Sequence, residues 1–141
     1  QKLRNSTLFI IGGGKLLNQY KYKYQTKNIR ILGFRKDVIR LIKACDFFVH
    51  STFMDNFPYV ILETMACEKP VITVNIGGIP DLVNNTVIMV DPHLREFEKK
   101  MVEGYQDESL RRCLARKALQ RSRLYDWKKI SKLFITLYKE M

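Results

Sequence analysis

Cysteine is scarce in this sequence, and its few copies stand far apart. Cys45, Cys67 and Cys113 are the only three among 141 residues, and no Cys-x-x-Cys pair occurs. Neither a zinc site nor a disulfide framework is therefore indicated. No cysteine–histidine arrangement of the kind used in nucleophilic catalysis is visible either. This cysteine usage favours a reducing cytoplasm as the compartment.

Long apolar runs are also missing. No stretch approaches the roughly 20 apolar residues that a membrane-spanning helix needs, and the residues before Leu8 are polar and basic, unlike a secretory signal. No Asp-x-Asp metal motif occurs, and we expect neither a metal nor a cofactor. The sequence has no initiator methionine, and strand-like sequence begins at Leu8. We therefore expect the chain to be part of a longer protein.

Acidic residues are few, and the basic excess is uneven. There are 14 Asp and Glu against 25 Lys and Arg, and residues 1–50 hold eleven basic residues against two acidic ones. A basic surface attracts nucleotides, other polyanions or an anionic membrane face, although such residues also solubilise helix faces. Nucleic acid is not expected as a partner, because no nucleic-acid-binding motif is present. Length and composition predict one globular domain over residues 1–141.

Short β-branched or aromatic runs alternate with amphipathic segments along the chain. Strands are expected at 8–11, 29–32, 47–49, 71–74 and 87–90, with helices at about 15–25, 37–44, 58–66 and 80–83 between them. From Leu94 onward we expect only helices, at about 94–104, 109–124 and from 126 to the end. This order predicts an α/β fold, a Rossmann-like doubly wound parallel sheet followed by C-terminal helices.

Ligands of such sheets bind at the carboxyl ends of the strands. Gly12, Gly13 and Gly14 follow the first expected strand and resemble a turn that cradles phosphate. They match neither the dinucleotide fingerprint nor the P-loop pattern, so a plain strand-to-helix turn remains an equal alternative. The ends at 33–36, 51–58 and 75–80 are the other candidates.

Two carboxylates form the most informative pattern. Asp55 lies in an expected loop, and Glu63 follows after seven intervening residues, inside the next expected helix. Asp55 would ordinarily cap that helix. Glu63 has apolar neighbours such as Ile61 and Met65, so we expect it near a buried face, where an unpaired acid is costly. A ribose diol could donate two hydrogen bonds to it, whereas a buried lysine partner is the structural alternative.

Several stretches together resemble glycosyltransferase family 4, whose enzymes have the two-domain GT-B fold. The matching stretches are residues 31–33, 37–46, 51–66, 69–72 and 77–81, and residues 126–130 match the closing helix that braces the two-domain body. In that family two carboxylates at this spacing mark the donor site, and the first, usually Glu, is here Asp55 in an Asp-Asn-x-Pro version. The resemblance implies the C-terminal, donor-binding half of a retaining, hexosyl-transferring enzyme of polysaccharide biosynthesis.

The resemblance also implies roles for individual residues. Glu63 would bind the ribose hydroxyls of a nucleotide-sugar donor, and Asp55, the catalytic candidate, would hold hydroxyls of the donor sugar. The backbone N–H groups of Asn56, Phe57 and Tyr59 would meet sugar or phosphate oxygens. Gly33, Phe34 and Arg35 would lie beside the nucleobase, and the hydroxyls of Ser51 and Thr52 would bind phosphate.

Three positions depart from the family pattern. His50, Thr64 and Glu68 stand where the family usually has proline, alanine and glycine. We interpret His50 as a packed or hydrogen-bonded histidine rather than a site residue. Glu68 is expected in the turn after a helix, where it would mainly affect local backbone strain.

The resemblance further implies what the rest of the enzyme supplies. The family's phosphate-binding arginine and lysine precede the strand at Leu8, and the acceptor domain lies outside these residues. We therefore expect the isolated chain to fold, to bind nucleotide weakly and to transfer no sugar. An acceptor of glycan or lipid-linked type would be glycosylated at the inner membrane face, with peripheral attachment through the basic first third. Two alternatives stay open: another GT-B enzyme, such as a sugar epimerase or a phosphorylase-like enzyme, and a non-catalytic nucleic-acid-binding module.

Overall fold

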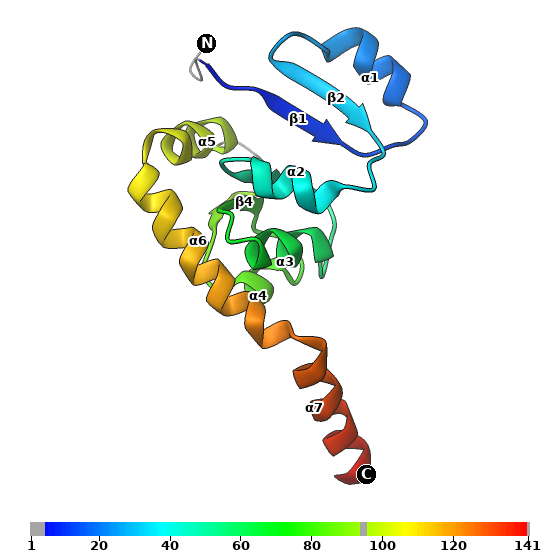
Figure 1. Cartoon of the computed structure of the whole chain (residues 1–141), viewed down its shortest axis with the longest axis vertical. Helices are drawn as coiled ribbons and strands as arrows, with labels where there is room; N and C mark the ends of the chain where they lie inside the picture. The colour runs from blue at the N-terminus through cyan, green and yellow to red at the C-terminus, as the bar shows by residue number, and fades with distance from the viewer. Residues whose placement is uncertain (1–4, 94–95, 141) are drawn as a thin grey trace. The chain divides into compact units, whose positions relative to one another are not determined.

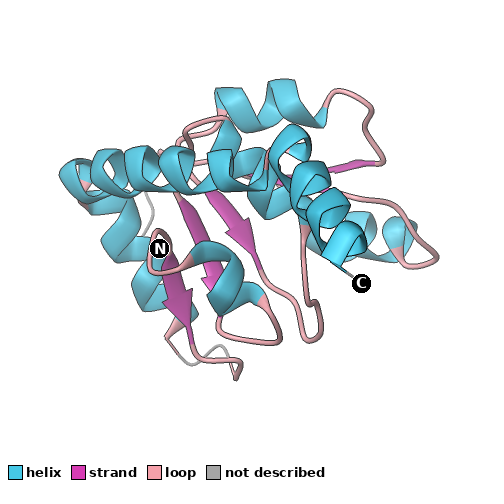
Figure 2. Cartoon of the chain, turned by 90° about the horizontal axis from the view of Figure 1, so that it is seen from below, coloured by secondary structure: helices cyan, strands magenta, loops and turns pink. Residues whose placement is uncertain are grey.

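The computed structural model of the chain describes residues 5–93 and 96–140, which fall into two compact units (Figure 1). Unit 1 extends to Leu41 and unit 2 begins at Ile42, so the boundary lies inside helix α2 (Val38–Ala44). Figure 2 shows the strands of the chain among its helices. The expectation of a single domain over residues 1–141 stays a prediction.

Unit 1 is a parallel βαβ element. Strand β1 (Leu8–Ile11) pairs with β2 (Ile29–Gly33), and helix α1 (Leu17–Tyr24) connects them. Gly33 ends β2 with φ +74°, a left-handed conformation that favours glycine. A β-carbon added to Gly33 would lie 3.4 Å from Leu17 Cδ2, so the glycine also allows α1 to approach the strand.

Unit 2 contains a three-stranded parallel sheet in the order β3-β4-β5. Its strands are β3 (Phe48–His50), β4 (Val71–Val74) and β5 (Ile88–Val90), connected by helices α3 (Tyr59–Ala66) and α4 (Ile79–Val83). All four residues of the central strand β4 are buried, as is typical of a strand covered on both faces. The predicted Rossmann-like α/β fold is confirmed, and the observed strands begin and end within one residue of the predicted ones.

The hydrophobic core of unit 2 lies between the sheet and its helices. Helix α3 contributes Ile61 and Met65, both fully buried, and α6 (Glu108–Ser122) contributes Ala118. The sheet, α4 and the turn before β5 supply the remaining buried members, which are Val71, Ile72, Val74, Ile79, Leu82, Val83, Val87 and Val90. Burying one such aliphatic side chain stabilises a fold by about 1.5–3 kcal/mol. This core fixes the positions of the loops at the carboxyl ends of β3 and β4.

Only helical structure follows the sheet among the described residues. It comprises α5 (Phe97–Gln106), α6, a 3₁₀ turn η1 (Arg123–Tyr125) and α7 (Trp127–Glu140). Asp107 caps α6, since its Oδ1 accepts a hydrogen bond of 2.8 Å from the Leu110 N–H. The helical prediction is confirmed from Phe97 onward, whereas Leu94 and Arg95 lie outside the described residues.

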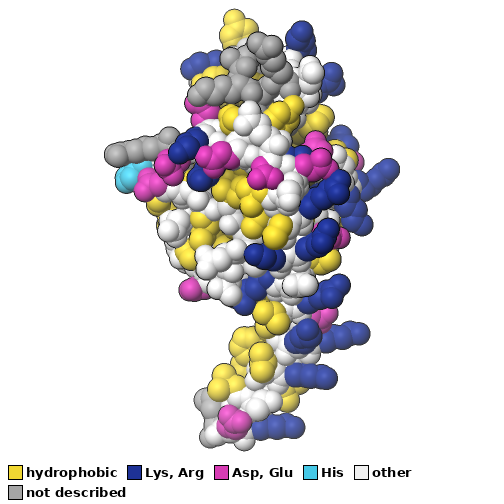
Figure 3. All heavy atoms as spheres, turned by 90° about the vertical axis from the view of Figure 1, so that its left-hand side faces the viewer, with side chains coloured by type: hydrophobic (Ala, Val, Ile, Leu, Met, Phe, Trp, Pro, Cys, Tyr) yellow, Lys and Arg dark blue, Asp and Glu magenta, His cyan; other side chains and the backbone are white. Residues whose placement is uncertain are grey.

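Helix α7 buries none of its residues. Trp127 and Tyr138 are each 71% exposed, and Phe134 is 53% exposed. Together with Leu137 they form an apolar stripe at helical spacing along α7. Figure 3 shows apolar side chains along one side of the lower helix and basic ones along the other. Within the part of the chain that the structure describes, no helix is both long and apolar enough to cross a membrane.

Candidate functional site

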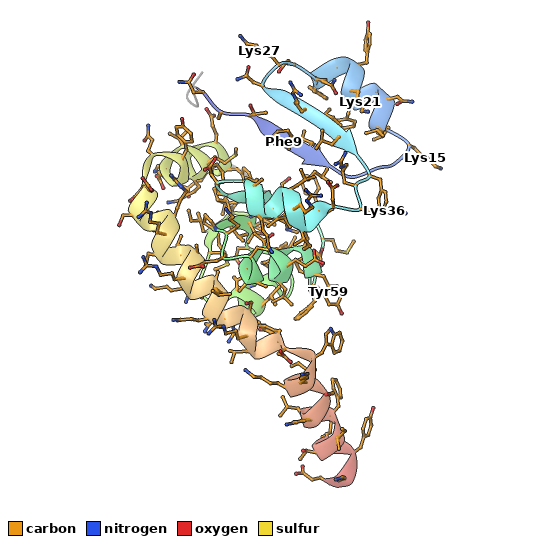
Figure 4. All side chains as sticks on the ribbon, viewed as in Figure 1. Phe9, Lys15, Lys21, Lys27, Lys36 and Tyr59 are labelled. Carbon is orange, nitrogen blue, oxygen red and sulfur yellow. The ribbon has the colours of Figure 1, made fainter. Side chains whose placement is uncertain are left out.

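The two predicted glycine turns of unit 1 lie side by side at the carboxyl ends of β1 and β2. The Gly12 N–H donates a 2.9 Å hydrogen bond to the Gly33 carbonyl, and a β-carbon on Gly13 would lie 3.7 Å from Phe34 Cβ. A pocket of about 330 Å³ opens here, lined by residues 10–17, Tyr20 and Ile31. Lys15 lies on the loop that follows β1 (Figure 4). The structure therefore brings the first two predicted strand ends together, and the pocket is lined by the first of them.

Arg35 is engaged in a local ion pair. Its Nε donates a 2.8 Å hydrogen bond to Asp37 Oδ1, and its Nη2 donates one of 2.8 Å to Asp37 Oδ2, so the contact is bidentate. This contact raises the pKa of the guanidinium and lowers the pKa of the carboxyl. The Asp37 carboxylate is thus engaged with Arg35, while the Asp37 backbone carbonyl accepts hydrogen bonds from the Arg40 and Leu41 N–H groups at the start of α2.

In unit 2 the predicted site residues 51–59 form the loop after β3 and the start of α3. Thr52 Oγ1 donates a 3.1 Å hydrogen bond to the Met54 carbonyl, which closes the first half of the loop. Asp55 Oδ1 accepts a 3.1 Å hydrogen bond from the Phe57 N–H and closes the second half. The Phe57 N–H is thereby occupied in this structure. The other Asp55 carboxylate oxygen accepts no hydrogen bond within the described chain, and Asp55 forms no ion pair there.

Two glycines after β4 allow this loop to approach the neighbouring strand end. Gly77 has φ +55°, and a β-carbon built on it would overlap the Asp55 carbonyl oxygen and lie 2.8 Å from Asn56 Oδ1. A β-carbon on Gly78 would overlap the Asn56 carbonyl oxygen. The conformation of the Asp55 loop therefore depends on two positions without side chains, which lie within the predicted strand end at 75–80.

Aromatic contacts connect the same loop to the C-terminal helices of unit 2. The Phe57 ring meets the Tyr59 ring edge-on at a centroid distance of 5.8 Å and the Tyr125 ring at 5.6 Å. Tyr59 is 62% exposed and lies at the start of α3 (Figure 4). Tyr125 follows Phe57 by 68 positions, so no local sequence pattern indicated this contact.

Glu63 points away from the core, contrary to the prediction. Ile61 and Met65 are fully buried on one side of α3, whereas Glu63 is exposed. The reason is helical spacing: at 100° per residue, Glu63 lies about 160° from either neighbour around the axis. The free-energy cost of placing an unpaired carboxylate at a buried face, expected from the sequence, therefore does not arise for Glu63. Within the described chain, Glu63 takes part in no ion pair, so the alternative of a buried lysine partner is not observed either.

The three departures from the family pattern each have a local explanation. His50 is half-buried, and its Nδ1 lies 3.3 Å from the Thr73 hydroxyl, as the hydrogen-bonded interpretation predicted. Burial lowers the pKa of His50, and the Asp55 carboxylate partly opposes this shift. Thr64 is fully buried, and its hydroxyl donates a 2.7 Å hydrogen bond to the Val60 carbonyl. Glu68 has φ +55°, in the left-handed region where the family's glycine would be unstrained.

The predicted site residues of unit 2 lie at the carboxyl end of β3 and the start of α3. In the ranges 5–93 and 96–140, no three His, Cys, Asp or Glu side chains gather as they would around a metal ion. Ser51 is exposed at the start of the loop, and Asn56 and Tyr59 follow Asp55 toward α3. The predicted site residues thus form two groups, one in each unit.

Sequence comparison shows the family. Residues 1–107, about three quarters of the chain, match the family described as Glycosyl transferases group 1. The chain belongs to the group 1 glycosyl transferases. This match includes every predicted site residue, from Gly12 to Glu63.

Two curated relatives illustrate the similarity. The chain is 27% identical to the N,N'-diacetylbacillosaminyl-diphospho-undecaprenol alpha-1,3-N-acetylgalactosaminyltransferase of Campylobacter jejuni, over 96% of this chain and 38% of that protein. It is 38% identical to the UDP-Gal:alpha-D-GlcNAc-diphosphoundecaprenol alpha-1,3-galactosyltransferase of Escherichia coli, over 57% of this chain and 22% of that protein. The chain thus spans less than half the length of these relatives.

Solved structures share the fold. HepE from Anabaena in complex with UDP superposes with a TM-score of 0.85 at 22% identity, covering 99% of this chain and 42% of that one. A glycosyltransferase from Rickettsia africae gives a TM-score of 0.85 at 22% identity, covering 97% and 40%. At this identity the likeness shows the fold alone, which corresponds to one Rossmann-like half of a GT-B glycosyltransferase.

Proposed function

We propose that this chain is the donor-binding half of a retaining glycosyltransferase of family 4, and that it holds a nucleoside-diphosphate sugar for transfer. The observation that carries the proposal is the carboxylate pair after β3. Asp55 lies in a loop packed against Gly77 and Gly78, and Glu63 is exposed on α3. Neither carboxylate forms an ion pair among the residues that the structure describes.

Each carboxylate has a chemical task in this proposal. An exposed carboxylate such as Glu63 accepts two hydrogen bonds from the 2′- and 3′-hydroxyls of a ribose, and charge-assisted bonds of this type are the strong ones. Asp55 uses one oxygen to hold the Phe57 N–H, which leaves the other for hydroxyls of the donor sugar. Asn56 and Tyr59 supply backbone N–H groups for sugar or phosphate oxygens, and the hydroxyls of Ser51 and Thr52 supply further contacts to phosphate.

Unit 1 carries its own group of proposed donor-binding residues. Its pocket is lined largely by apolar side chains and by the turn Gly12, Gly13 and Gly14, whose backbone can approach a ligand closely. Phe34 and Gly33 are the candidates for contact with a nucleobase. Arg35 would act there as a fixed cation, because its bidentate bond to Asp37 holds the guanidinium in place.

We propose a UDP-sugar as the donor and a lipid-linked or glycan acceptor. Two relatives support this choice, since the E. coli enzyme is named for UDP-Gal and both names include a diphospho-undecaprenol acceptor. The structures of HepE with UDP and with UDP-glucose add support for the base. Cations that stabilise the leaving diphosphate, and the acceptor site, would be supplied by the rest of the enzyme. That part would also cover the apolar stripe of α7, and the whole would work at the inner membrane face in the cytoplasm.

Nucleotide titration of the 141-residue chain tests the proposal. We expect UDP to bind weakly and more tightly than GDP or ADP in isothermal titration calorimetry. Glu63→Gln removes the charge but keeps the shape, and it should weaken UDP binding about tenfold, as expected for the loss of one charge-assisted contact. Glu68→Gln is the matched control, because Glu68 is exposed in the turn after the same helix. Equal UDP affinity of Glu63→Gln and wild type would refute the proposed role of Glu63.

A second titration separates the proposal from nucleic-acid binding. A short single-stranded oligonucleotide should bind no more tightly than UDP, and any binding should collapse with added salt, because counterion release drives it. UDP binding that depends on Glu63 should survive the same increase in salt. Asp55→Asn keeps the acceptor for the Phe57 N–H and removes only the charge, so its loss of UDP-sugar affinity, without loss of stability, would report on the sugar contact.

A further inference from the structure

Tyr125 contacts the loop that carries Asp55, although it lies on η1, between α6 and α7. Its ring meets the Phe57 ring at a centroid distance of 5.6 Å and an interplanar angle of 68°. Aromatic rings favour this edge-to-face arrangement, because the positive edge of one ring faces the negative face of the other. Phe57 is two residues after Asp55 and donates its N–H to the Asp55 carboxylate, so a shift of Phe57 also shifts the acid.

Tyr125 is itself fixed in place by hydrogen bonds. Its hydroxyl donates to the Leu82 carbonyl at 3.2 Å, and Arg121 Nη2 donates to the same hydroxyl at 3.0 Å. Arg121 also donates through Nε to the Leu82 carbonyl at 3.1 Å and through Nη2 to the Asp81 carbonyl at 2.7 Å. Its guanidinium carbon lies 5.3 Å from the centre of the Tyr125 ring. The ring is therefore held from its hydroxyl end and over its face.

Both supports of the Asp55 loop are connected through α4. Gly77 and Gly78, which pack against the backbone of Asp55 and Asn56, directly precede α4. The carbonyls of Asp81 and Leu82, which bind Arg121 and Tyr125, belong to α4 itself. Gly77 and Gly78, just before α4, thus hold the backbone of the loop. Tyr125, whose hydroxyl bonds to the Leu82 carbonyl of α4, holds the Phe57 side chain.

We propose that Tyr125 is a positioning residue, whose ring holds Phe57 and thereby keeps the Asp55 loop in the conformation that receives the donor. This role rests on the donor site proposed above. The chemistry remains with Asp55 and Glu63, and Tyr125 acts only through Phe57. Arg121 completes the arrangement by fixing the Tyr125 hydroxyl. A residue from the helical segment after the sheet thereby determines donor affinity without touching the donor.

Hydrogen exchange measures the positioning without any ligand. In Tyr125→Leu we expect the amides of residues 53–57 to exchange about fivefold faster than in wild type, in line with the loss of one edge-to-face pair. The amides of β4 should exchange at the wild-type rate. Tyr125→Phe keeps the ring and removes the bonds to Leu82 and Arg121, so it should accelerate exchange of the same amides to a smaller extent. It also provides a variant of nearly unchanged volume if Tyr125→Leu folds poorly. Tyr22→Leu, at a tyrosine that is 95% exposed in unit 1, is the matched control.

A double-mutant cycle on UDP binding tests whether Tyr125 acts through Phe57. Tyr125→Leu should weaken UDP binding in the wild-type background and have no further effect in a Phe57→Leu background. A purely structural role would lower stability in both backgrounds to the same extent and leave the two UDP effects additive. Additive effects, or unchanged exchange at residues 53–57 with UDP binding intact, refute the positioning role. If the wild-type chain binds no UDP, the proposed donor site is refuted, and so is the proposed effect of Tyr125 on donor affinity. The hydrogen-exchange rates of residues 53–57 still decide whether Tyr125 holds the loop.

Discussion

The carbonyl oxygen of Asp55 lies where a side chain on Gly77 would stand. A β-carbon at Gly77 would overlap this oxygen, and the backbone there has φ +55°. The two residues are 22 positions apart and follow neighbouring parallel strands, β3 and β4. Space left by a missing side chain therefore decides the position of the candidate catalytic carboxylate.

Gly77→Ala should be strongly destabilising. The left-handed backbone and the overlap with the Asp55 carbonyl act together, so we expect the free energy of unfolding to fall by about 2 kcal/mol or more. Urea denaturation followed by circular dichroism measures this change. Gly13→Ala is the control, because a β-carbon there meets nothing closer than 3.7 Å and φ is not positive. If Gly77→Ala lowered the free energy of unfolding no more than Gly13→Ala, the close approach of the Asp55 carbonyl to Gly77 would be contradicted.

Glu68→Gly should stabilise the protein. Glu68 occupies the left-handed region at φ +55° after α3, a conformation that costs a residue with a side chain about 1 kcal/mol. Glycine removes most of this strain, although its greater freedom in the unfolded chain offsets part of the gain. Glu68→Ala keeps the strain and removes the carboxylate, so it should not raise the midpoint of urea unfolding. If Glu68→Gly and Glu68→Ala had equal midpoints of urea unfolding, any stabilisation would come from removing the charge and not from relieving backbone strain.

Stability should fall as the pH is lowered below 7, partly through His50. Burial lowers the pKa of His50 in the folded state, so the unfolded chain binds this proton at a higher pH than the folded one. The free energy of unfolding is therefore reduced as the pH falls through the unfolded-state value of about 6.5. His50→Asn keeps a polar partner for Thr73 and removes the titration, so its stability should vary less between neutral pH and mild acid. His93→Asn, at an exposed histidine, serves as the substitution control.

The apolar stripe of α7 should make the isolated chain associate with itself. Trp127, Phe134 and Leu137 are 71%, 53% and 53% exposed, and contiguous apolar surface of this kind promotes association. Replacing Phe134 and Leu137 by serine should shift sedimentation velocity toward the monomer. Lys132→Ser, on the polar side of α7, should not. A wild-type chain that is already monomeric at high concentration would show that the stripe drives no association.

Much of the fold could be read from local sequence. Alternating apolar runs placed all five strands within one residue, because strand burial leaves a signal that repeats over a few positions. The glycine turns at 12–14 and 33 were located in the same way, since a strand that ends at glycine marks its own boundary. The spacing of Asp55 and Glu63 and the resemblance around them indicated the family, which the match over residues 1–107 bears out at the level of group 1 glycosyl transferases.

Only the tertiary structure decided how the candidate site is held. Apolar neighbours in sequence suggested that Glu63 is near a buried face, but the helical turn places it opposite Ile61 and Met65. The dependence of Asp55 on Gly77, and of Phe57 on Tyr125, joins segments that are distant in the chain. Periodicity reports which face of an element is apolar, whereas contacts between loops depend on how the core packs those elements together. The sequence thus determined the strands, the turns and the carboxylates, and packing determined which residues hold them in place.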